Sequence, residues 1–270
     1  MEWKDQDVLR YSRNLLLREI GPTGQEKLFS SAALVVGAGG LGSPALLYLA
    51  AAGVGRIGVI DGDRVDLSNL NRQTIHSESS VGRAKACSAQ ASLLAFRSDL
   101  DVEVHDTALT TENALSLFRR YDVVVDGSDN FPTKYLCNDA SVLSGVPLVH
   151  AGILRFGGQI LSVVPGRGPC LRCLLPDIPP RRDAPTCSEA GILGASAGVM
   201  GSWQAVEAVK LLLGIGAPLL GRLLMIDTLD ASVSTLEVKK DPECPACGES
   251  PRILSPLSPL EYGLDRSAPL

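Results

Sequence analysis

Long hydrophobic runs are absent from the chain, and so is a secretory signal. The most apolar stretch, 190–203, is rich in Gly and Ser and gives way to polar residues from Gln204 onward, so no run reaches the roughly 18 apolar residues of a membrane helix. The first residues, MEWKDQDVLRYSRN, are too polar for a signal peptide. We therefore expect a cytoplasmic protein that makes no membrane contact.

The chain also has fewer positively charged residues than negatively charged ones. The 270 residues carry a net charge of −5, and the isoelectric point is about 5.3. A phosphate-backbone partner usually requires a basic face, so we expect no nucleic-acid partner. Hydrophobic residues make up 45% of the chain and charged residues 20%, which is enough to bury a sizeable core.

Short apolar runs alternate with helical stretches over the first half of the chain. We expect strands at 33–37, 56–61, 101–106, 122–129 and 147–152, separated by helices near 41–52, 82–96, 111–118 and 131–144. Nearly continuous apolar strands in repeated β-α-β order predict an α/β fold with a doubly wound, Rossmann-like, mainly parallel sheet.

The pattern changes after Gly152. Segments 157–165 and 232–240 resemble half-buried antiparallel strands that extend the same sheet, and a long apolar helix is expected between them at 189–213. The Pro- and Arg-rich stretch 166–185 predicts a loop. We divide the chain into a helical arm (1–30), a main domain (31–248) and a tail (249–270), whose Pro and Ser content predicts poor packing.

A glycine-rich turn follows the first expected strand. Gly37, Gly39 and Gly42 form a GxGxxG pattern at the head of a helix, where backbone N–H groups can approach phosphates. Asp61 ends the second strand, 19 residues beyond Gly42, where a carboxylate can accept hydrogen bonds from ribose. The sequence predicts a ribonucleotide site, although the glycines alone would also suit a tight turn and do not distinguish ATP from NAD.

The residues after Asp61 are unusual for an NAD enzyme. DGDRVDLSNLNRQ begins at Asp61, Lys85 lies on the next helix, and DGSDN ends a later strand. These segments are expected to meet at the carboxyl ends of neighbouring strands. Arg72 and Lys85 can neutralise a triphosphate, and Asp129 can hold Mg²⁺ between phosphate oxygens. Each of these side chains, taken singly, also fits a solvated surface residue.

The seven cysteines lie in a chain without an export signal, so metal ligands, nucleophiles or core residues are expected rather than disulfides. The pairs Cys170/Cys173 and Cys244/Cys247 are CxxC motifs in Gly- and Pro-rich turns. Four thiolates suit a structural, tetrahedral Zn²⁺ site. Two unrelated pairs, or a redox CxxC, would be the alternative.

The remaining cysteines receive separate predictions. Cys187 precedes the long apolar helix, and a thiol near a helix N-terminus has a lowered pKa. A catalytic and a structural role both stay open for it. Cys87 and Cys137 lie on apolar helical stretches and are expected in the core.

Several longer motifs point to one family. They are RYSRNLLL, GAGGLGSPALLYLAAAGVGRIGVIDGDRVDLSNLNRQTIH, VGRAKA, DGSDNFPTKYLCND, TCSEAGILG and the two CxxC pairs. Through them, residues 8–248 resemble the MoeB/ThiF family of ubiquitin-activating-like adenylyltransferases. The main domain is then an adenylation domain with a zinc site.

The resemblance implies ATP as the nucleotide, with Asp61 on the ribose and Arg13 reaching the partner's phosphates across a homodimer interface. The implied nucleotide-binding set is Gly37, Gly39, Gly40, Gly42, Asp61, Asp63, Ser68, Asn69, Leu70, Asn71, Arg72, Lys85, Asp129 and Asn130. The implied catalytic set is Arg13, Arg72, Lys85, Asp129 and Cys187.

The implied substrate is the C-terminal Gly-Gly carboxylate of a β-grasp sulfur-carrier protein of the MoaD, ThiS or a related type. Its carboxylate would attack the α-phosphate of ATP and release pyrophosphate. Because the carboxylate is already ionised at neutral pH, no general base is needed. In this family the cysteine corresponding to Cys187 can link to the activated carrier, but some members do not require it.

Two departures from the family pattern stand out. Asn14 follows Arg13 where glutamine is common, and the chain ends at Leu270, so the rhodanese domain of longer relatives is expected to be absent and a separate sulfurtransferase to supply sulfur. Two other functions stay possible at this stage: an NAD-dependent oxidoreductase, and a non-catalytic nucleotide-binding scaffold for a ubiquitin-like partner. The set of Arg72, Lys85 and Asp129 disfavours both.

Overall fold

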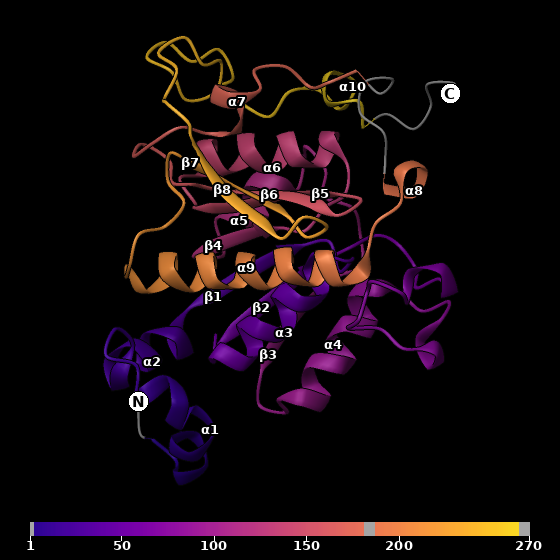
Figure 1. Ribbon diagram of the computed structural model, residues 1–270, viewed down its shortest axis with the longest axis vertical. Coiled ribbons are helices and arrows are strands. Elements are labelled where there is room, and N and C mark those ends of the chain that lie inside the picture. The colour runs from indigo at the N-terminus through magenta and orange to yellow at the C-terminus, as the bar shows by residue number, and fades with distance from the viewer. Residues whose placement is uncertain (1–2, 181–186, 265–270) are drawn as a thin grey trace.

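The computed structural model describes residues 3–180 and 187–264, with only the backbone for residues 187 and 188. One eight-stranded sheet runs through it in the order β3-β2-β1-β4-β5-β6-β7-β8 (Figure 1). The parallel strands are β1 (Ala32–Val36), β2 (Arg56–Ile60), β3 (Asp101–His105), β4 (Val123–Asp126) and β5 (Leu148–Leu154). The antiparallel extension is β6 (Gly157–Val163), β7 (Arg222–Asp227) and β8 (Ser232–Glu237). The predicted fold class is confirmed.

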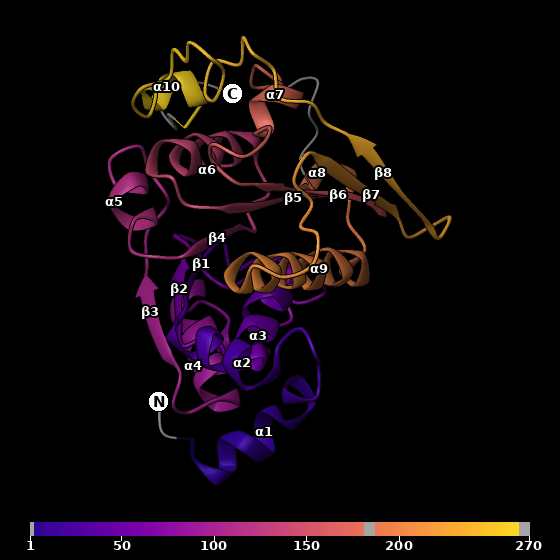
Figure 2. The ribbon, with the colours of Figure 1, turned by 90° about the vertical axis from the view of Figure 1, so that its left-hand side faces the viewer.

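Helices cover both faces of the parallel part of the sheet (Figure 2). One face carries α3 (Gly42–Ala52), α4 (Lys85–Phe96) and α9 (Gly194–Leu213), and the other carries α5 (Ala114–Phe118) and α6 (Phe131–Ser144). The protein has one hydrophobic core on each face of the sheet, because strand side chains alternate between the two faces. Val35 faces the first layer and its neighbours Leu34 and Val36 face the second, because successive strand side chains point to opposite faces.

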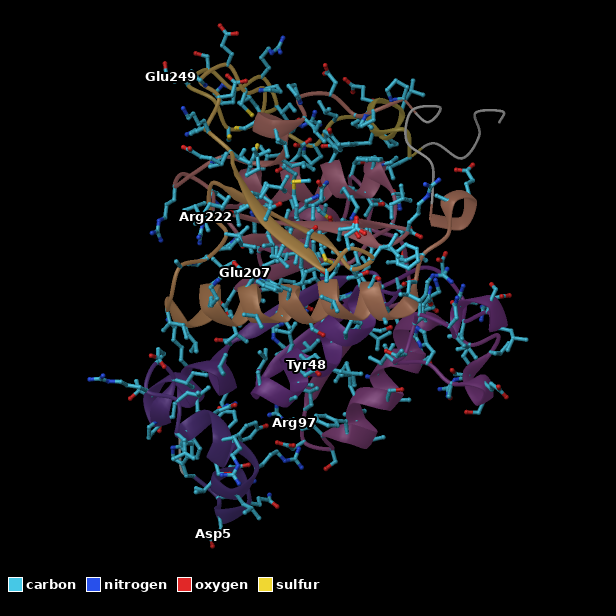
Figure 3. All side chains as sticks on the ribbon, in the orientation of Figure 1. Asp5, Tyr48, Arg97, Glu207, Arg222 and Glu249 are labelled. Atoms are coloured by element: carbon cyan, nitrogen blue, oxygen red, sulfur yellow. The ribbon has the colours of Figure 1, made fainter. Side chains whose placement is uncertain are left out.

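The N-terminal arm and the described part of the C-terminal tail lie at opposite ends of the described molecule. The arm formed by α1 (Asp5–Leu15) and α2 (Gly21–Ser30) lies below α3 and α9, and the segment that carries Glu249 lies above α6 (Figures 1 and 3). Most residues of the described tail, 249–264, are exposed, but the prediction of poor packing is wrong for two of them. Ile253 and Tyr262 are buried, and α10 (Pro259–Tyr262) packs against α6.

The region after β6 departs from the sequence expectation in two ways. The long helix begins at Gly194, because Gly191 has a positive φ of 80° that ends the one-turn α8 (Cys187–Ala190). Every residue of β8 is exposed, so β8 is not the half-buried strand that its alternation predicted. The expected loop 166–185 contains the short helix α7 (Leu171–Leu174), and residues 181–186 lie outside the described part. No described helix is long and apolar enough to span a membrane.

Candidate active site

The carboxyl ends of β1 and β4 form the topological switch point of the sheet. From β1 the chain proceeds outward to β2 and β3, and then returns to place β4 on the other side of β1. Doubly wound sheets bind ligands in the crevice at such a point. The glycine turn 37–42 follows β1 and the turn 126–130 follows β4, so the sheet brings both predicted turns together.

These two turns pack too closely for side chains at three positions. Gly37 has a positive φ of 89°, and a Cβ on Gly42 would lie 1.8 Å from the Gly37 carbonyl oxygen. A Cβ on Gly127 would lie 3.0 Å from the Gly42 nitrogen. Gly39 differs, since a Cβ there would meet only the side chain of Gln73, at 3.7 Å. Packing therefore requires glycine at the first three positions and leaves the backbone at Gly39 open to a ligand.

Asp61 joins the glycine turn to the loop that follows β2. Its carboxylate accepts hydrogen bonds from the backbone N–H groups of Ala38 and Asp63, both at 2.8 Å. Burial raises the pKa of Asp61 above its ordinary value, and the nearby charge of Lys85 partly offsets the rise. In the free protein Asp61 thus holds the turn in place, and part of the carboxylate remains accessible.

Lys85 and Asp63 form an ion pair in this loop. The Lys85 ammonium lies 2.9 Å from the Asp63 carboxylate, and the exposed fractions of the two side chains are 8% and 65%. The Lys85 backbone N–H also donates to the Asp63 carbonyl. Lys85 is therefore not a freely solvated helix residue: its charge is held at the edge of the site.

The loop 66–73 arranges the remaining polar groups. Its 3₁₀ turn, Leu67–Asn69, is capped by Asp66 and continues through Leu70 and Asn71. Arg72 donates to the Ser68 carbonyl oxygen and to the Asn71 side chain, both at 3.0 Å. A Cβ on Gly40 would lie 3.6 Å from Cγ of Arg72, which places the aliphatic part of the Arg72 side chain beside the glycine turn.

Asp129 and Asn130 follow β4 and have different roles. The Asn130 side chain caps α6 by accepting from the Thr133 backbone N–H at 2.9 Å. Asp129 is exposed, and within residues 3–180 and 187–264 its carboxylate has no hydrogen bond or ion pair. Its oxygens are thus available to a ligand or a hard cation.

Arg13 is not brought to this site within one chain. The neighbouring Asn14 donates to the carbonyl of Ala52 at the C-terminal end of α3, whereas the glycine turn precedes the opposite end of that helix. Eleven residues of helix separate the two ends, about 16 Å. Arg13 is exposed.

Three buried polar residues beside these turns were missed by the sequence reasoning. Asp126 is fully buried and lies 2.9 Å from His150 and 3.4 Å from Lys134. Burial alone would raise its pKa, but Lys134 and His150 outweigh that effect and lower the pKa to about 2. The signal available in the sequence was Lys134 itself, a lysine next to the apolar run of an otherwise buried helix face.

Two further residues beside the glycine turn were also missed. The ring of His76 lies 2.9 Å from both the Ala38 carbonyl oxygen and the Ser88 hydroxyl, and burial lowers its pKa. Gln73 is 5% exposed, and its side-chain oxygen has no partner among the described residues. Both follow Arg72 in the sequence, so proximity to the NLNRQ segment was the available signal.

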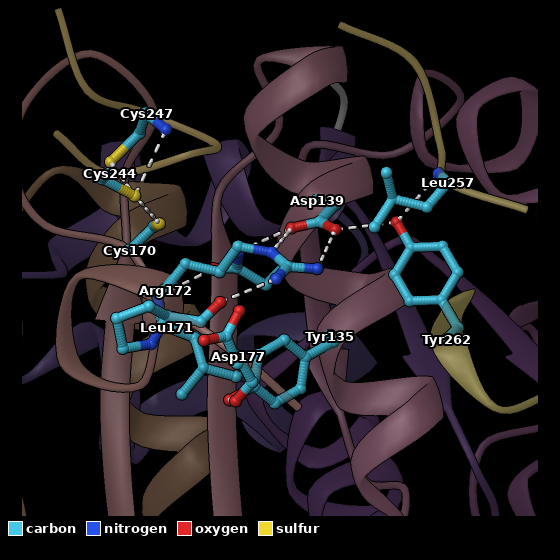
Figure 4. Close-up of polar contacts among 12 residues, drawn as sticks. Tyr135, Asp139, Cys170, Leu171, Arg172, Asp177, Cys244, Cys247, Leu257 and Tyr262 are labelled. Atoms are coloured by element: carbon cyan, nitrogen blue, oxygen red, sulfur yellow. Dashed lines mark hydrogen bonds and ion pairs between the residues drawn. The ribbon is translucent and has the colours of Figure 1, made fainter. Parts of the chain in front are cut away.

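The four cysteines of the CxxC pairs converge on one point, and Figure 4 shows three of them, Cys170, Cys244 and Cys247. The four sulfurs all lie within 4.8 Å of one another, with Cys170 3.6 Å from Cys244 and Cys173 3.4 Å from Cys247. Hydrogen bonding from the Cys170 thiol lowers the pKa of Cys173 to about 6, which favours a thiolate. The sulfur cluster is of the size that a single tetrahedral ion requires, because a Zn–S bond of about 2.3 Å places sulfurs about 3.8 Å apart.

A buried ion pair ties this cluster to α6. Arg172, between the first two cysteines, makes two hydrogen bonds to Asp139, at 2.7 and 2.8 Å. The hydroxyl of Tyr262 from the tail donates to the same carboxylate at 2.7 Å (Figure 4). Tyr135 anchors the segment after α7 by donating to the carbonyl oxygens of Leu175 and Asp177.

The other cysteines are placed less uniformly. Cys137 is fully buried, as expected, but Cys87 is only partly buried. The side chain of Cys187 lies outside the described residues. Its backbone belongs to the four-residue α8 and not to the long helix, so the argument from the N-terminus of the long helix is wrong.

Comparisons with known proteins identify the family of the chain. A model of the ThiF family matches residues 11–246. The chain is 50% identical over 256 residues to the sulfur carrier protein adenylyltransferase of Thermus thermophilus, covering 93% of this chain and 94% of that protein. It is 48% identical over 248 residues to the adenylyltransferase and sulfurtransferase MOCS3 of Sus scrofa, where it spans about half (54%) of the relative's length and 92% of its own.

A solved structure shows the same fold. The crystal structure of E. coli MccB with ATP matches at a TM-score of 0.78 and 24% sequence identity, covering 88% of this chain and 74% of that one. The family match, and not this more distant likeness, decides the classification. The chain belongs to the ThiF family, as an enzyme of the adenylyltransferase kind.

Proposed function

We propose that the protein uses ATP to adenylylate the C-terminal glycine carboxylate of a β-grasp sulfur-carrier protein. The observation that carries this proposal is the presence of three features around one switch point: an open glycine turn, the cations Arg72 and Lys85, and the exposed carboxylate of Asp129, which has no partner among the described residues. The names of the relatives, which include a sulfur carrier protein adenylyltransferase, supply the substrate class. Adenylyl transfer therefore replaces the NAD-dependent alternative.

The nucleotide would lie across the glycine turn. The open backbone at Gly39 suits close approach by phosphates, and Asp61 at the end of β2 suits a ribose hydroxyl. The side-chain oxygen of Gln73, which has no partner among the described residues, adds a buried acceptor beside the same turn. The wider set predicted from the sequence, including Gly40, Ser68, Asn69, Leu70 and Asn71, lines the loop next to it.

The reaction would require positioning and charge neutralisation, with no proton transfer. A carboxylate oxygen of the carrier forms a bond to the α-phosphorus as the bond to the bridging oxygen of pyrophosphate breaks, and the leaving group carries away the negative charge. Arg72 and Lys85 stabilise that charge. Mg²⁺ bound by Asp129 would supply further neutralisation, for which the exposed and unpartnered oxygens of Asp129 are suited.

A second copy of the chain would complete the site. Arg13 is exposed, and its neighbour Asn14 bonds to the end of α3 that lies far from the glycine turn of the same chain, so a contribution of Arg13 to ATP would go to a partner. Apolar residues exposed on α3 and α9 offer a surface for such a homodimer: Tyr48, Val199, Trp203 and Val206.

The cysteine cluster would hold a structural zinc ion. The sulfur separations fit tetrahedral coordination, and two thiols already accept hydrogen bonds from backbone N–H groups of Asp241 and Cys247. All four ligands come from Cys170, Cys173, Cys244 and Cys247, so no coordination position is open to substrate. The ion would tie the segment after β8 to α7.

The client of the enzyme would be a carrier of molybdopterin, thiamine or tRNA-thiolation type, with sulfur supplied by a separate sulfurtransferase. Adenylation as written leaves Cys187 without a required step. Cys187 could still attack the acyl-adenylate to form a thioester, with AMP as the leaving group. Alkylation of Cys187 is expected to leave carrier adenylation intact in either case, and formation of the carrier thiocarboxylate separates the two possibilities: normal thiocarboxylate formation after alkylation would mean that Cys187 is not catalytic.

The test is ATP–pyrophosphate exchange with purified protein, Mg²⁺ and several carriers that end in Gly-Gly. Each carrier is compared with a form that lacks the last two residues. Exchange is expected with one intact carrier and not with its truncated form. Tight ATP binding without exchange for any carrier would instead support a nucleotide-binding scaffold.

A further inference from the structure

A buried lysine lies directly beneath the turn that carries Asp129. The ammonium group of Lys134 donates to the carbonyl oxygens of Ser128 and Ala151, at 2.7 and 2.5 Å, and lies 3.4 Å from the carboxylate of Asp126. The Lys134 side chain is 8% exposed and Asp126 is fully buried. Neither group takes part in the chemistry described above.

The three acceptors mark the place where β4 stops and its neighbour continues. β4 pairs with β5 as far as Asp126 opposite His150. The Pro147 carbonyl oxygen, just before β5, accepts a hydrogen bond from a backbone N–H of β4. Carbonyl groups alternate in direction along a strand, so the Ala151 carbonyl, four residues later, also points toward the β4 side. No strand residue of β4 remains to pair with Ala151, so Lys134 supplies the missing donor.

The same lysine fixes the backbone that precedes Asp129. Lys134 holds the Ser128 carbonyl, while Asp126 accepts from the Ser128 backbone N–H at 3.0 Å and from its hydroxyl. On the other side of Asp129, Asn130 is fixed as the cap of α6. The Asp129 carboxylate itself has no partner among the described residues, so only its backbone determines where its oxygens lie.

We propose that Lys134 is a positioning residue for adenylation, which sets the place of the Asp129 carboxylate by anchoring the Ser128 carbonyl to β5. The inference rests on the proposed function in assigning Asp129 a role toward the metal–nucleotide complex. A buried ion pair is weak evidence for stability alone, because apolar residues of similar volume often serve as well. Its contacts to two backbone carbonyls beside the site give this one a geometric role.

His150 provides a matched comparison inside the cluster. It contacts the same Asp126 carboxylate at 2.9 Å and is also buried, but among the described residues it is Lys134, and not His150, that bonds to the Ser128 carbonyl. If the cluster serves stability alone, loss of either side chain has similar consequences. If Lys134 positions Asp129, only its loss changes the response to Mg²⁺.

The test measures binding of α,β-methylene ATP by calorimetry as a function of Mg²⁺ concentration, for Lys134→Met, Lys134→Arg, His150→Gln and the exposed control Lys239→Met. Lys134→Met is expected to bind the analogue normally in EDTA and to need about 10-fold to 100-fold more Mg²⁺ for the half-maximal gain in affinity. Lys134→Arg, which keeps the charge, is expected to lie between Lys134→Met and wild type. His150→Gln and Lys239→Met are expected to match wild type.

Several outcomes overturn the inference. They are a wild-type Mg²⁺ response in folded Lys134→Met, an equal shift in His150→Gln, or no effect of Mg²⁺ on binding by the wild type. If Lys134→Met does not fold, Lys134→Arg decides, since the inference requires a raised Mg²⁺ midpoint in that variant. If the wild type binds the ATP analogue with Mg²⁺ but never exchanges pyrophosphate, the proposed function is contradicted while the inference about Lys134 still holds.

Discussion

Two polar regions at opposite ends of α6 differ in how their side chains are partnered. At its N-terminal end, the Asp129 carboxylate is exposed and has no partner within residues 3–180 and 187–264. Toward its C-terminal end, the Asp139 carboxylate is fully buried and shared by Arg172 and Tyr262. The first arrangement leaves oxygens free for a ligand, and the second uses them up within the protein.

The comparison indicates where function and stability reside in this molecule. A side chain whose hydrogen bonds are complete contributes mainly to the folded state, because its removal leaves buried groups unsatisfied. An exposed and unpartnered side chain contributes little to stability and can be replaced without unfolding the chain. Substitutions at the two ends of α6 should therefore have opposite effects.

The largest expected effect is on the cysteine cluster. Cys244→Ser removes one of four sulfurs at a fully buried position, and a structural zinc site of this kind contributes about 10 kcal/mol or more to folding. The zinc content should fall from about one ion per chain to nearly none, and the melting temperature should fall strongly. Cys87→Ser is the control. A fully stable, zinc-free wild type would contradict the structural role.

The buried carboxylate gives the next effect. Asp139→Ala leaves the Arg172 guanidinium buried without its partner, which is expected to lower the free energy of unfolding by about 3–5 kcal/mol. Denaturant unfolding measures the change. An Asp139→Ala protein as stable as wild type would contradict the claim that the buried polar region stabilises the fold.

The exposed carboxylate should behave in the opposite way. Asp129→Ala removes no contact among the described residues, so the melting temperature is expected to stay at the wild-type value. Pyrophosphate exchange is expected to fall by about 10²–10³-fold, as when other preorganised charge-stabilising groups are removed. Exchange at the wild-type rate would remove the assignment of Asp129 to the metal.

The dependence of stability on acid pH tests the buried cluster of Asp126, Lys134 and His150. The folded pKa of Asp126 is lowered to about 2 from 3.8, so its ionised form stabilises the fold above pH 3.8 and that contribution is lost as the pH falls toward 2. The difference corresponds to about 2 kcal/mol. Unfolding curves of Asp126→Asn should lack this part of the acid dependence. An unchanged acid profile would show that Asp126 is not held as an anion.

The smallest expected effect concerns the tail. Tyr262→Phe removes a single hydrogen bond to Asp139 and is expected to lower the free energy of unfolding by about 1–3 kcal/mol. Tyr48→Phe changes an exposed hydroxyl and serves as the control. Equal stabilities of the two variants would show that the tail does not stabilise α6.

The parallel half of the fold was predictable because each strand carries its own signal. Continuous Val and Ile runs gave all five parallel strands to within about three residues, and the glycine turn and CxxC spacings predicted which segments would meet. The main shortening is in β4, which ends at Asp126 because Gly127 to Asn130 must form the turn against Gly37.

Helix α2 lies within the expected helical arm 1–30, although its first turn contains two glycines and a proline, which favour a loop; Leu28 on this helix packs in the core. The missed elements depend on contacts between distant segments. β7 was overlooked, although the apolar run from Leu223 to Ile226 was a usable signal. The burial of Tyr262 and the role of Lys134 could not be seen locally, because their partners lie 123 and 17 residues away in the chain.

ATP–pyrophosphate exchange in the presence of a sulfur carrier is the most direct test of the central claim. The measurement compares one carrier with an intact Gly-Gly tail against the same carrier without it, at saturating Mg²⁺. The account predicts exchange that requires the tail and that Asp129→Ala lowers by about 10²–10³-fold without unfolding the protein. Exchange that is indifferent to the tail, or tight ATP binding with no exchange for any carrier, would contradict it.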